Sequence, residues 1–367
     1  MRVVLCDMMR LWRGGQRQFV LLAEGLARRG EDVLCIVRSG SPLQEHLQRK
    51  GLPHKAISVA FEADITAVWR IGEFCRRFNA QLIHSHDSHS HWLAGLAALW
   101  LRIPHIVSRR VDFHIFRHGW GFSWFKYRYF ADGYIAVSRA AADVLKNCGV
   151  PESKIFVVQS GLPLHPPRRR DIRSVLGLPP DTTVVGTVGD MVPHKGHWVF
   201  VEAAADIRLP NVHFVIIGDG PLRSRLRALI SRRNLQNRFH LAGRLSAAEE
   251  FVGSFDIFVM SSVQEGLGTS VLDAYRCGVP VVATKAGGLP EVVEDGVSGL
   301  LAEIGDARSL AHAIMKVLED GRLRKRLVAG GKELLKNRFS ADIMVERTLS
   351  VYRRYVEVPR RCYRRKT

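Results

Sequence analysis

The sequence contains no apolar run long enough to cross a membrane. A spanning helix needs roughly 20 apolar residues, and the apolar stretch at residues 92–101 has about half that length. The first residues, MRVVLCDMM, also lack the apolar core and the small-residue cleavage site of a secretory signal. We therefore expect a cytoplasmic protein without a membrane-spanning segment.

Cysteine and acidic residues are both scarce. The six cysteines are scattered and form no C-x-x-C pair, so no disulfide framework is indicated and free thiols in a reducing compartment are expected. The chain has 54 Lys and Arg against 35 Asp and Glu, which gives a formal net charge of +19. This surplus favours an anionic partner, which can be nucleic acid, anionic lipid or a phosphorylated substrate. Charge alone does not choose among these partners.

Apolar strand-like segments alternate with helical patterns along the chain, which is typical of parallel sheets covered by helices. The alternation breaks at residues 161–171, GLPLHPPRRRD, because prolines continue neither element. We therefore predict an α/β protein with two Rossmann-like, doubly wound domains at residues 1–165 and 166–339, and a helix and basic tail at 340–367. The expected strands are 2–6, 32–37, 80–84, 106–108 and 134–137, then 183–188, 212–217, 239–241, 257–260 and 279–283.

Two glycine-containing loops follow predicted strands, where open α/β sheets bind their ligands. Gly14 and Gly15 precede the first helix, whose free N–H groups suit an anion, although a plain tight turn explains them equally well. They do not form G-x-G-x-x-G, so a dinucleotide site is not indicated. Lys195, near the end of VGDMVPHKG, is placed to meet phosphate oxygens as a point charge, and a solvated surface lysine is the alternative.

Residues 262–278, SVQEGLGTSVLDAYRCG, are the most informative segment. Gly268 precedes a predicted helix at residues 269–277. The backbone amides of Thr269 and Ser270 lie at its N-terminus, where they suit a diphosphate.

Two carboxylates accompany this helix. Glu265 lies before the glycines, and Asp273 lies one helical turn inside, on the same side as Thr269. One carboxylate for sugar hydroxyls and one for a ribose is a consistent division of roles. Two exposed carboxylates flanking a helix are the alternative.

The segment at 265–278, with VPVVATKAGGLPE after it, resembles the donor-site signature of the family-4 retaining glycosyltransferases. Shorter matches follow in the expected order over nearly the whole chain: Gly14-Gly15, His84-Ser-His86-Asp87, Gln159-Ser-Gly161, Lys195-Gly196, Ile217-Gly-Asp-Gly-Pro221 and Asp295-Gly-Val-Ser-Gly-Leu300. The resemblance implies a GT-B fold, with two domains facing an inter-domain cleft and a last helix that crosses back to the N-terminal domain. It also implies retention of configuration, no divalent metal ion and no cofactor besides a nucleotide-diphosphate-sugar donor, whose base is unknown. The acceptor would bind the N-terminal domain and the donor the C-terminal domain.

By position, the resemblance assigns roles to individual residues. Lys195 would hold the donor diphosphate and neutralise its charge as it leaves. Glu265 would contact the donor sugar and Asp273 the ribose. The remaining members of the phosphate cradle would be Gly14, Gly15, Gly268, Thr269 and Ser270.

Three residues depart from the family pattern. Asp273 stands where a second Glu is common, and Asp190 stands where many members have an Arg that contacts phosphate. Arg110 occupies an N-domain position often held by His beside the donor sugar. We interpret Arg110 as a catalytic residue that stabilises the departing phosphate and compensates for Asp190.

Four histidines lie close together in the N-terminal half: His84, His86, His89 and His91. No Cys accompanies them and they lie between a strand and a loop, so a tetrahedral zinc site is not expected. His86, a catalytic candidate, or Asp87 is instead expected to contact substrate. Solvated loop histidines are the alternative.

Residues 109–128 combine five Arg or Lys and one acidic residue with several Phe, Trp and Tyr side chains. This mixture is typical of an anchor on anionic lipid, and it also suits base stacking or a buried core with a solvated charged face. We predict a peripheral protein on the inner face of the cytoplasmic membrane.

The leading hypothesis is a glycosyltransferase with a glycan or glycolipid acceptor in bacterial envelope synthesis, of lipopolysaccharide or exopolysaccharide. The alternatives are a sugar-nucleotide epimerase of the same fold and a basic nucleic-acid-binding protein. The latter lacks a recognisable binding module, so no nucleic acid is expected as a partner.

Overall fold

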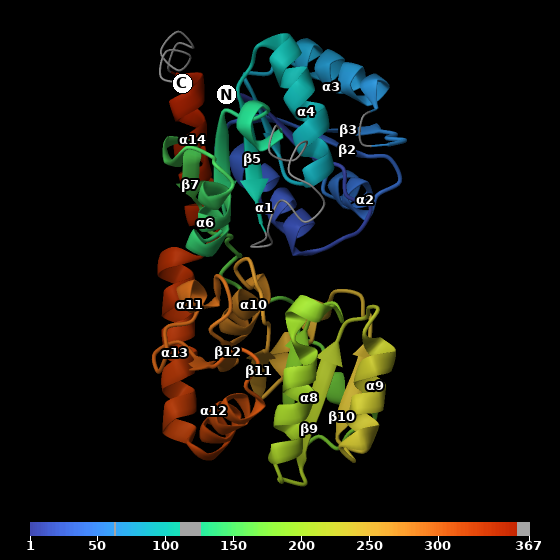
Figure 1. Cartoon of the computed structure of the whole chain (residues 1–367), viewed down its shortest axis with the longest axis vertical. Helices are drawn as coiled ribbons and strands as arrows, with labels where there is room; N and C mark the ends of the chain where they lie inside the picture. The colour runs from blue at the N-terminus through green and yellow to red at the C-terminus, as the bar shows by residue number, and fades with distance from the viewer. Residues whose placement is uncertain (62–63, 111–125, 358–367) are drawn as a thin grey trace. The chain divides into compact units, whose positions relative to one another are not determined.

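The computed structural model describes residues 1–61, 64–110 and 126–357, and it divides the chain into two compact units. Unit 1 contains Met1–Ser160 and the chain from Ala341 onward, and unit 2 is Gly161–Ser340 (Figure 1). The sequence predicts these borders after residues 165 and 339. Each unit is described by itself below.

Unit 1 is built on a parallel sheet of seven strands in the order β3-β2-β1-β4-β5-β6-β7. The strand order reverses between the adjacent strands β1 and β4, so the loops that follow these two strands start side by side. The strands are β1 (Arg2–Asp7), β2 (Asp32–Arg38), β3 (His54–Ile57), β4 (Leu82–Ser85), β5 (His105–Arg109), β6 (Gly133–Ala136) and β7 (Ile155–Val157).

Helices cover both faces of this sheet, so its central strands are apolar on both sides. In β1, Val3 and Leu5 face a core shared with α1 and α14, whereas Val4 and Cys6 face a core shared with α3 and α4. The helices are α1 (Gly14–Arg28), α2 (Pro42–Arg49), α3 (Ile65–Arg77), α4 (Ser88–Leu101), α6 (Arg139–Asn147) and α14 (Ala341–Val356), with a 3-10 turn η1 (Glu152–Lys154).

Unit 2 repeats the plan with six parallel strands in the order β10-β9-β8-β11-β12-β13. The reversal lies between β8 and β11. The strands are β8 (Thr183–Val188), β9 (Val212–Ile217), β10 (Phe239–Gly243), β11 (Ile257–Met260), β12 (Val281–Thr284) and β13 (Leu300–Ala302). The helices are α7 (Ile172–Leu176), α8 (His197–Asp206), α9 (Arg223–Arg232), α10 (Thr269–Cys277), α11 (Leu289–Val292), α12 (Ala307–Glu319) and α13 (Gly321–Arg338), with 3-10 turns η2 (Pro193–Lys195), η3 (Ala248–Glu250) and η4 (Val252–Ser254).

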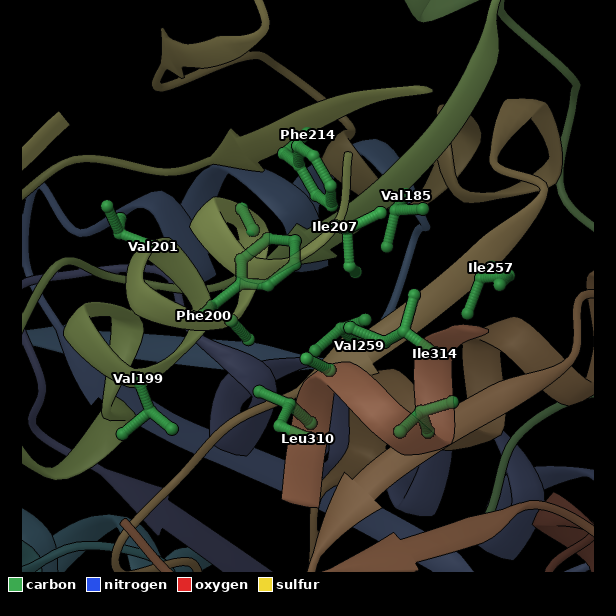
Figure 2. Packing of buried hydrophobic residues seen from close by; sticks show 14 of the residues in the cluster. Val185, Val199, Phe200, Val201, Ile207, Phe214, Ile257, Val259, Leu310 and Ile314 are labelled. Atoms are coloured by element: carbon green, nitrogen blue, oxygen red, sulfur yellow. The ribbon is translucent and has the colours of Figure 1, made fainter. Parts of the chain in front are cut away.

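One apolar core holds α8 and α12 against a face of the unit 2 sheet. Phe200 of α8 meets Phe214 of β9 edge to face, with ring centroids 5.8 Å apart (Figure 2). Val259 of β11 and Ile314 of α12 belong to the same fully buried cluster (Figure 2). This core fixes the sheet whose strand ends carry the candidate donor residues.

The two parallel α/β sheets confirm the predicted fold class. Gly14 and Gly15, expected just before a helix, are instead the first two residues of α1. Within the part of the chain described here, no helix combines the length and the apolarity needed to cross a bilayer.

Candidate functional site

The loop after β8 is fastened to the loop after β11. Gly196 follows η2 with φ of +58°, and a Cβ there would lie 2.1 Å from the Ser261 carbonyl oxygen. The amide of Val263 donates to the His194 carbonyl oxygen at 2.9 Å. A side chain at position 196 would separate the two loops, so the close approach that positions Lys195 depends on a glycine.

Lys195 and Glu265 form an ion pair across these loops. Lys195 Nζ lies 2.6 Å from Glu265 Oε2, and Ser262 Oγ donates to the same oxygen at 3.0 Å. The Lys195 side chain is 18% exposed and the Glu265 side chain 14%. The structure thus brings together two residues that the sequence analysis assigned to the donor, as an ammonium group and an acceptor carboxylate in a largely enclosed position.

The N-terminus of α10 lies next to this pair in the chain. Its N-cap, Gly268, has φ of +87°, and a Cβ there would lie 2.5 Å from the Leu289 side chain. The first amides of a helix, here those of Thr269 and Ser270, have no acceptor within the helix. Both residues are half-buried, and their amides add partial positive charge beside the Lys195–Glu265 pair. The helix itself supplies this charge, so no further basic side chain is needed for it.

Asp273 is buried within α10 and pairs with a neighbour on the same helix. Its carboxylate lies 2.8 Å from Arg276 Nη2, and both side chains are less than a tenth exposed. The alternative of two exposed carboxylates at this helix is therefore wrong. The assignment of Asp273 to a ribose stays a prediction.

Asp190, which departs from the family pattern, has a basic neighbour. Its Oδ1 lies 3.7 Å from Arg244 Nη2, after β10, and the Arg244 side chain is well exposed. Because it is acidic where many family members have a phosphate-contacting Arg, Asp190 adds negative charge to this loop. Arg244 offsets that charge within unit 2, and the sequence analysis did not identify it because no motif marks it.

In unit 1, the chain brings Asp7, His86 and Arg110 together. They lie at or just after the ends of β1, β4 and β5, which are neighbours in the sheet. Arg110 Nη2 donates to His86 Nδ1 at 2.8 Å. The first turn of α1 is also close, since a Cβ on Gly15 would lie 3.5 Å from Arg110 Cδ. His86 and Arg110, the catalytic candidates of the N-terminal half, are therefore direct neighbours.

Burial sets the charge states in this cluster. It lowers the pKa of His86 well below 6.5, assisted by His84 and Arg110, so the imidazole is neutral and accepts the guanidinium hydrogen bond. The other ring nitrogen, Nε2, is buried and has no hydrogen-bond partner among the residues the structure describes. Burial also lowers the pKa of Arg110, to about 10, which leaves it charged at neutral pH. The cluster thus holds one cation beside one neutral imidazole.

Asp7 is the acidic member of the cluster, and the sequence analysis did not single it out. Burial, followed by the Asp87 carboxylate, raises its pKa to about 7. Hydrogen bonds from the Met9 amide and the Gln16 side chain, both at 2.9 Å, oppose that shift, as does the charge of Arg110. Its place at the end of an apolar strand is the signal that points to it.

The four histidines identified in the sequence do not gather at one point. His84 and His86 have ring centroids 4.1 Å apart, but His84 bonds to Tyr352 OH at 2.6 Å and Ser108 Oγ at 2.8 Å. His91 packs instead against Tyr127. Across the described ranges, no three His, Cys, Asp or Glu side chains converge into a set able to hold a metal ion.

A small pocket in unit 1 opens beside these residues. Its polar lining includes Gln18, His84, His86, Arg110, Ser160 and Thr348. Thr348 belongs to α14, so the last helix of the chain contributes to the pocket wall. Most of the aromatic and basic segment predicted to bind lipid, at residues 111–125, lies outside the described residues.

Two family models match the chain side by side. "Glycosyltransferase Family 4" matches residues 12–165 and "Glycosyl transferases group 1" matches residues 168–334. Together they cover most of unit 1 and most of unit 2.

Curated relatives include two proteins of Rhizobium meliloti described as lipopolysaccharide core biosynthesis glycosyltransferases. LpsE is 36% identical over 179 residues, which are 49% of this chain and 52% of LpsE. The chain thus spans only about half the length of that relative. LpsD is 26% identical over 349 residues, which are 94% of this chain and 96% of LpsD.

Among solved structures, Anabaena HepE in complex with UDP and glucose superposes with a TM-score of 0.84 and 21% identity. The match covers 96% of this chain and 99% of HepE. At this identity the likeness concerns the fold, which is that of GT-B glycosyltransferases.

Proposed function

Because the chain belongs to the glycosyltransferase family whose sequence models match both of its units, we propose that it moves a sugar from a nucleotide-diphosphate donor to a glycan or glycolipid acceptor. We propose further that the transfer retains the anomeric configuration and needs no divalent metal ion. Unit 2 would bind the donor and unit 1 the acceptor.

The observation that carries this proposal is the enclosed Lys195–Glu265 pair beside the N-terminus of α10. A diphosphate gains negative charge on the leaving oxygen as the sugar departs, so a fixed ammonium group and helix amides stabilise the transition state more than the ground state. Glu265 accepts hydrogen bonds, which suits sugar hydroxyls. Because Glu265 neutralises Lys195 before the donor arrives, the phosphates compete with a carboxylate for the same ammonium group.

The acceptor proposal rests on the relatives. LpsE and LpsD carry names from lipopolysaccharide core biosynthesis, and the net charge of +19 suits an anionic glycolipid. We therefore propose a role in bacterial envelope glycan synthesis. The relatives described above are transferases, so neither a sugar-nucleotide epimerase nor a nucleic-acid-binding protein is favoured.

The first experiment is a panel of UDP-, GDP-, ADP- and dTDP-sugars, tested by thermal shift on the wild type and on Lys195→Ala. We expect one donor class to stabilise the wild type, and Lys195→Ala to bind that donor at least about tenfold more weakly because a charged contact is lost. Lys316→Ala, an exposed lysine on α12, is the matched control and should bind normally. Equal donor affinity in Lys195→Ala and Lys316→Ala would contradict the proposal.

A further inference from the structure

Helices α3 and α4 of unit 1, together with Phe61 from the chain before α3, expose large apolar side chains. Phe61 is 64% exposed, Ile65 78%, Trp69 58% and Trp100 52%. We call these four residues the α3–α4 ridge. Monomeric proteins expose single apolar residues freely, but a contiguous group with two tryptophans marks an interaction surface.

The ridge is continuous because of how the two helices pack. Ile65 and Trp69 are four residues apart and so lie on one face of α3. Gly72 lies one turn further, and a Cβ there would come within 2.3 Å of the Trp100 ring, so the indole rests directly on the α3 backbone. Figure 1 shows the two helices as neighbours at the edge of unit 1. Trp100 therefore continues the row that Ile65 and Trp69 begin.

The fold of unit 1 does not need these side chains in its core. The opposite face of α3 already supplies Ala67, Ile71 and Cys75, all fully or almost fully buried in the core shared with α4. Two apolar side chains that are more than half exposed, Ile65 and Trp69, add little to that core. These exposed side chains are therefore available to contact a partner.

The rim of the ridge is basic. Four exposed arginines lie on the same two helices or directly after them: Arg70, Arg76, Arg77 and Arg102. The nearby carboxylate of Glu73 pairs with Arg76 and Arg77, each at 2.7 Å. Asp64, the N-cap of α3, adds a second carboxylate directly before Ile65. Two described acidic groups against four guanidinium groups still leave the rim positively charged.

We propose that the α3–α4 ridge docks unit 1 on an anionic lipid bilayer. Tryptophan and aliphatic side chains enter the headgroup region while arginines at the rim meet lipid phosphates, the arrangement of an interfacial amphipathic helix. A second copy of the chain fits less well, because a self-complementary contact would bring two basic rims together. The ridge shares no residue with the Lys195 and Arg110 clusters, and the proposal does not rest on the transferase activity.

The test is co-sedimentation of the full chain with vesicles of phosphatidylcholine alone and of phosphatidylcholine mixed with phosphatidylglycerol. We expect the wild type to prefer the anionic vesicles and Ile65→Ser/Trp69→Ser to partition about tenfold more weakly, because two interfacial anchors are lost. Trp198→Ser, a 44% exposed tryptophan of unit 2, is the matched control and should partition like the wild type. Unchanged melting of the double variant shows that the loss is not unfolding.

A second variant tests the rim separately. Arg70→Gln/Arg102→Asn should reduce the preference for anionic over neutral vesicles and its dependence on salt; Asn suits position 102, where φ is +56°. Equal partitioning of the wild type and Ile65→Ser/Trp69→Ser overturns the proposal, as does a wild type that binds neither vesicle. A wild-type dimer that Ile65→Ser/Trp69→Ser dissociates also overturns it, because the ridge would then bind a second copy. Donor-induced thermal shifts should be the same in the wild type and both ridge variants, so failure here is distinguishable from failure of the proposed transferase function.

Discussion

Two adjacent arginines at the end of β5 make different contacts. Arg109 Nη1 donates to Tyr127 OH at 3.1 Å, whereas Arg110 Nη2 donates to His86 Nδ1 at 2.8 Å beside buried Asp7. Both are arginines on one short segment, so each serves as a control for the other. Only Arg110 lines the small pocket at the strand ends.

Replacing Arg110 by Ala is expected to slow sugar transfer by about a hundredfold, the size typical of losing one preorganised charge-stabilising donor. Arg109→Ala should slow it only a few-fold, because its partner is Tyr127. Steady-state kinetics with the donor identified in the thermal-shift panel compare the two variants. Equal losses in kcat would remove the reason for assigning Arg110 to catalysis.

Asp7 makes the stability of unit 1 depend on pH in an unusual direction. Its pKa is about 7 in the folded chain against an ordinary value of 3.8 for an exposed aspartate, so between these pH values the native state binds more protons than the unfolded state. Stability contributed by Asp7 therefore falls as pH rises through this window, because a buried charge must form. The contribution becomes constant about one pH unit above the folded pKa, where Asp7 is ionised in both states.

The free energy of unfolding of the wild type minus that of Asp7→Ala is therefore expected to fall between pH 4 and pH 7, by on the order of 3 kcal/mol. Urea denaturation at several pH values measures the difference, which removes the contributions of titrating groups that do not interact with Asp7. A difference that stays constant or rises over this range would show that Asp7 is already ionised in the folded chain at low pH.

At the scale of elements, the loop that carries Lys195 depends on one glycine. Gly196→Ala introduces a Cβ 2.1 Å from the Ser261 carbonyl oxygen, at φ of +58°. Gly305 has a similar φ of +75° but nothing within 4 Å of a Cβ, so Gly305→Ala carries the same backbone strain without the collision. We expect Gly196→Ala to weaken donor binding at least about tenfold and Gly305→Ala to leave it unchanged. Isothermal titration with the donor checks this, and equal affinities would mean that the two loops can part without cost.

The elements that the sequence predicted best are those buried on both faces. β8, β9 and β11 were placed correctly because their apolar runs are continuous and bounded by turn residues. β3 (HKAI) was missed, because an edge strand of four residues with one buried side chain shows little periodicity. β12 begins at Val281, later than predicted, directly after Pro280.

The residues of the candidate site were likewise predicted only in part from the sequence. The donor residues Lys195 and Glu265 were found from glycine-flanked motifs, and the structure brings them within 2.6 Å. Asp7 and Arg244 were not found, because their meaning depends on which strands are neighbours. Sequence shows that a carboxylate ends an apolar strand, but not that β1, β4 and β5 lie together in the sheet.

At the scale of the whole molecule, the last helix of the chain packs into the unit formed by the N-terminal residues. α14 belongs to unit 1, where Val345, Leu349 and Tyr352 share a core with α1 and β1. Tyr352 also fixes His84 through a hydrogen bond of 2.6 Å between its hydroxyl and Nδ1. The unit 1 pocket therefore depends on a helix that follows all of unit 2 in the sequence.

Helix α14 packs closely against a glycine of α1, Gly25. A Cβ at Gly25 would lie 2.4 Å from Val345 Cγ2, so Gly25→Ala must push the helices apart. Alanine favours a helix by about 1 kcal/mol over glycine, and overpacking typically costs 1–3 kcal/mol, so we expect a net loss of about 1 kcal/mol. Gly321→Ala, where nothing lies within 4 Å, should be neutral or stabilising.

The double variant Gly25→Ala/Val345→Ala separates the collision from other effects. Removing the Val345 methyl groups opens a small cavity but also makes room for the new Cβ, so adding Gly25→Ala to Val345→Ala should be close to neutral. Urea denaturation of the four chains of this cycle gives the coupling free energy, and amide exchange in α1 and α14 locates it. Additive losses would mean that α14 is not held by the close approach at Gly25, and that the His84–Tyr352 hydrogen bond and the surrounding core seat the helix instead.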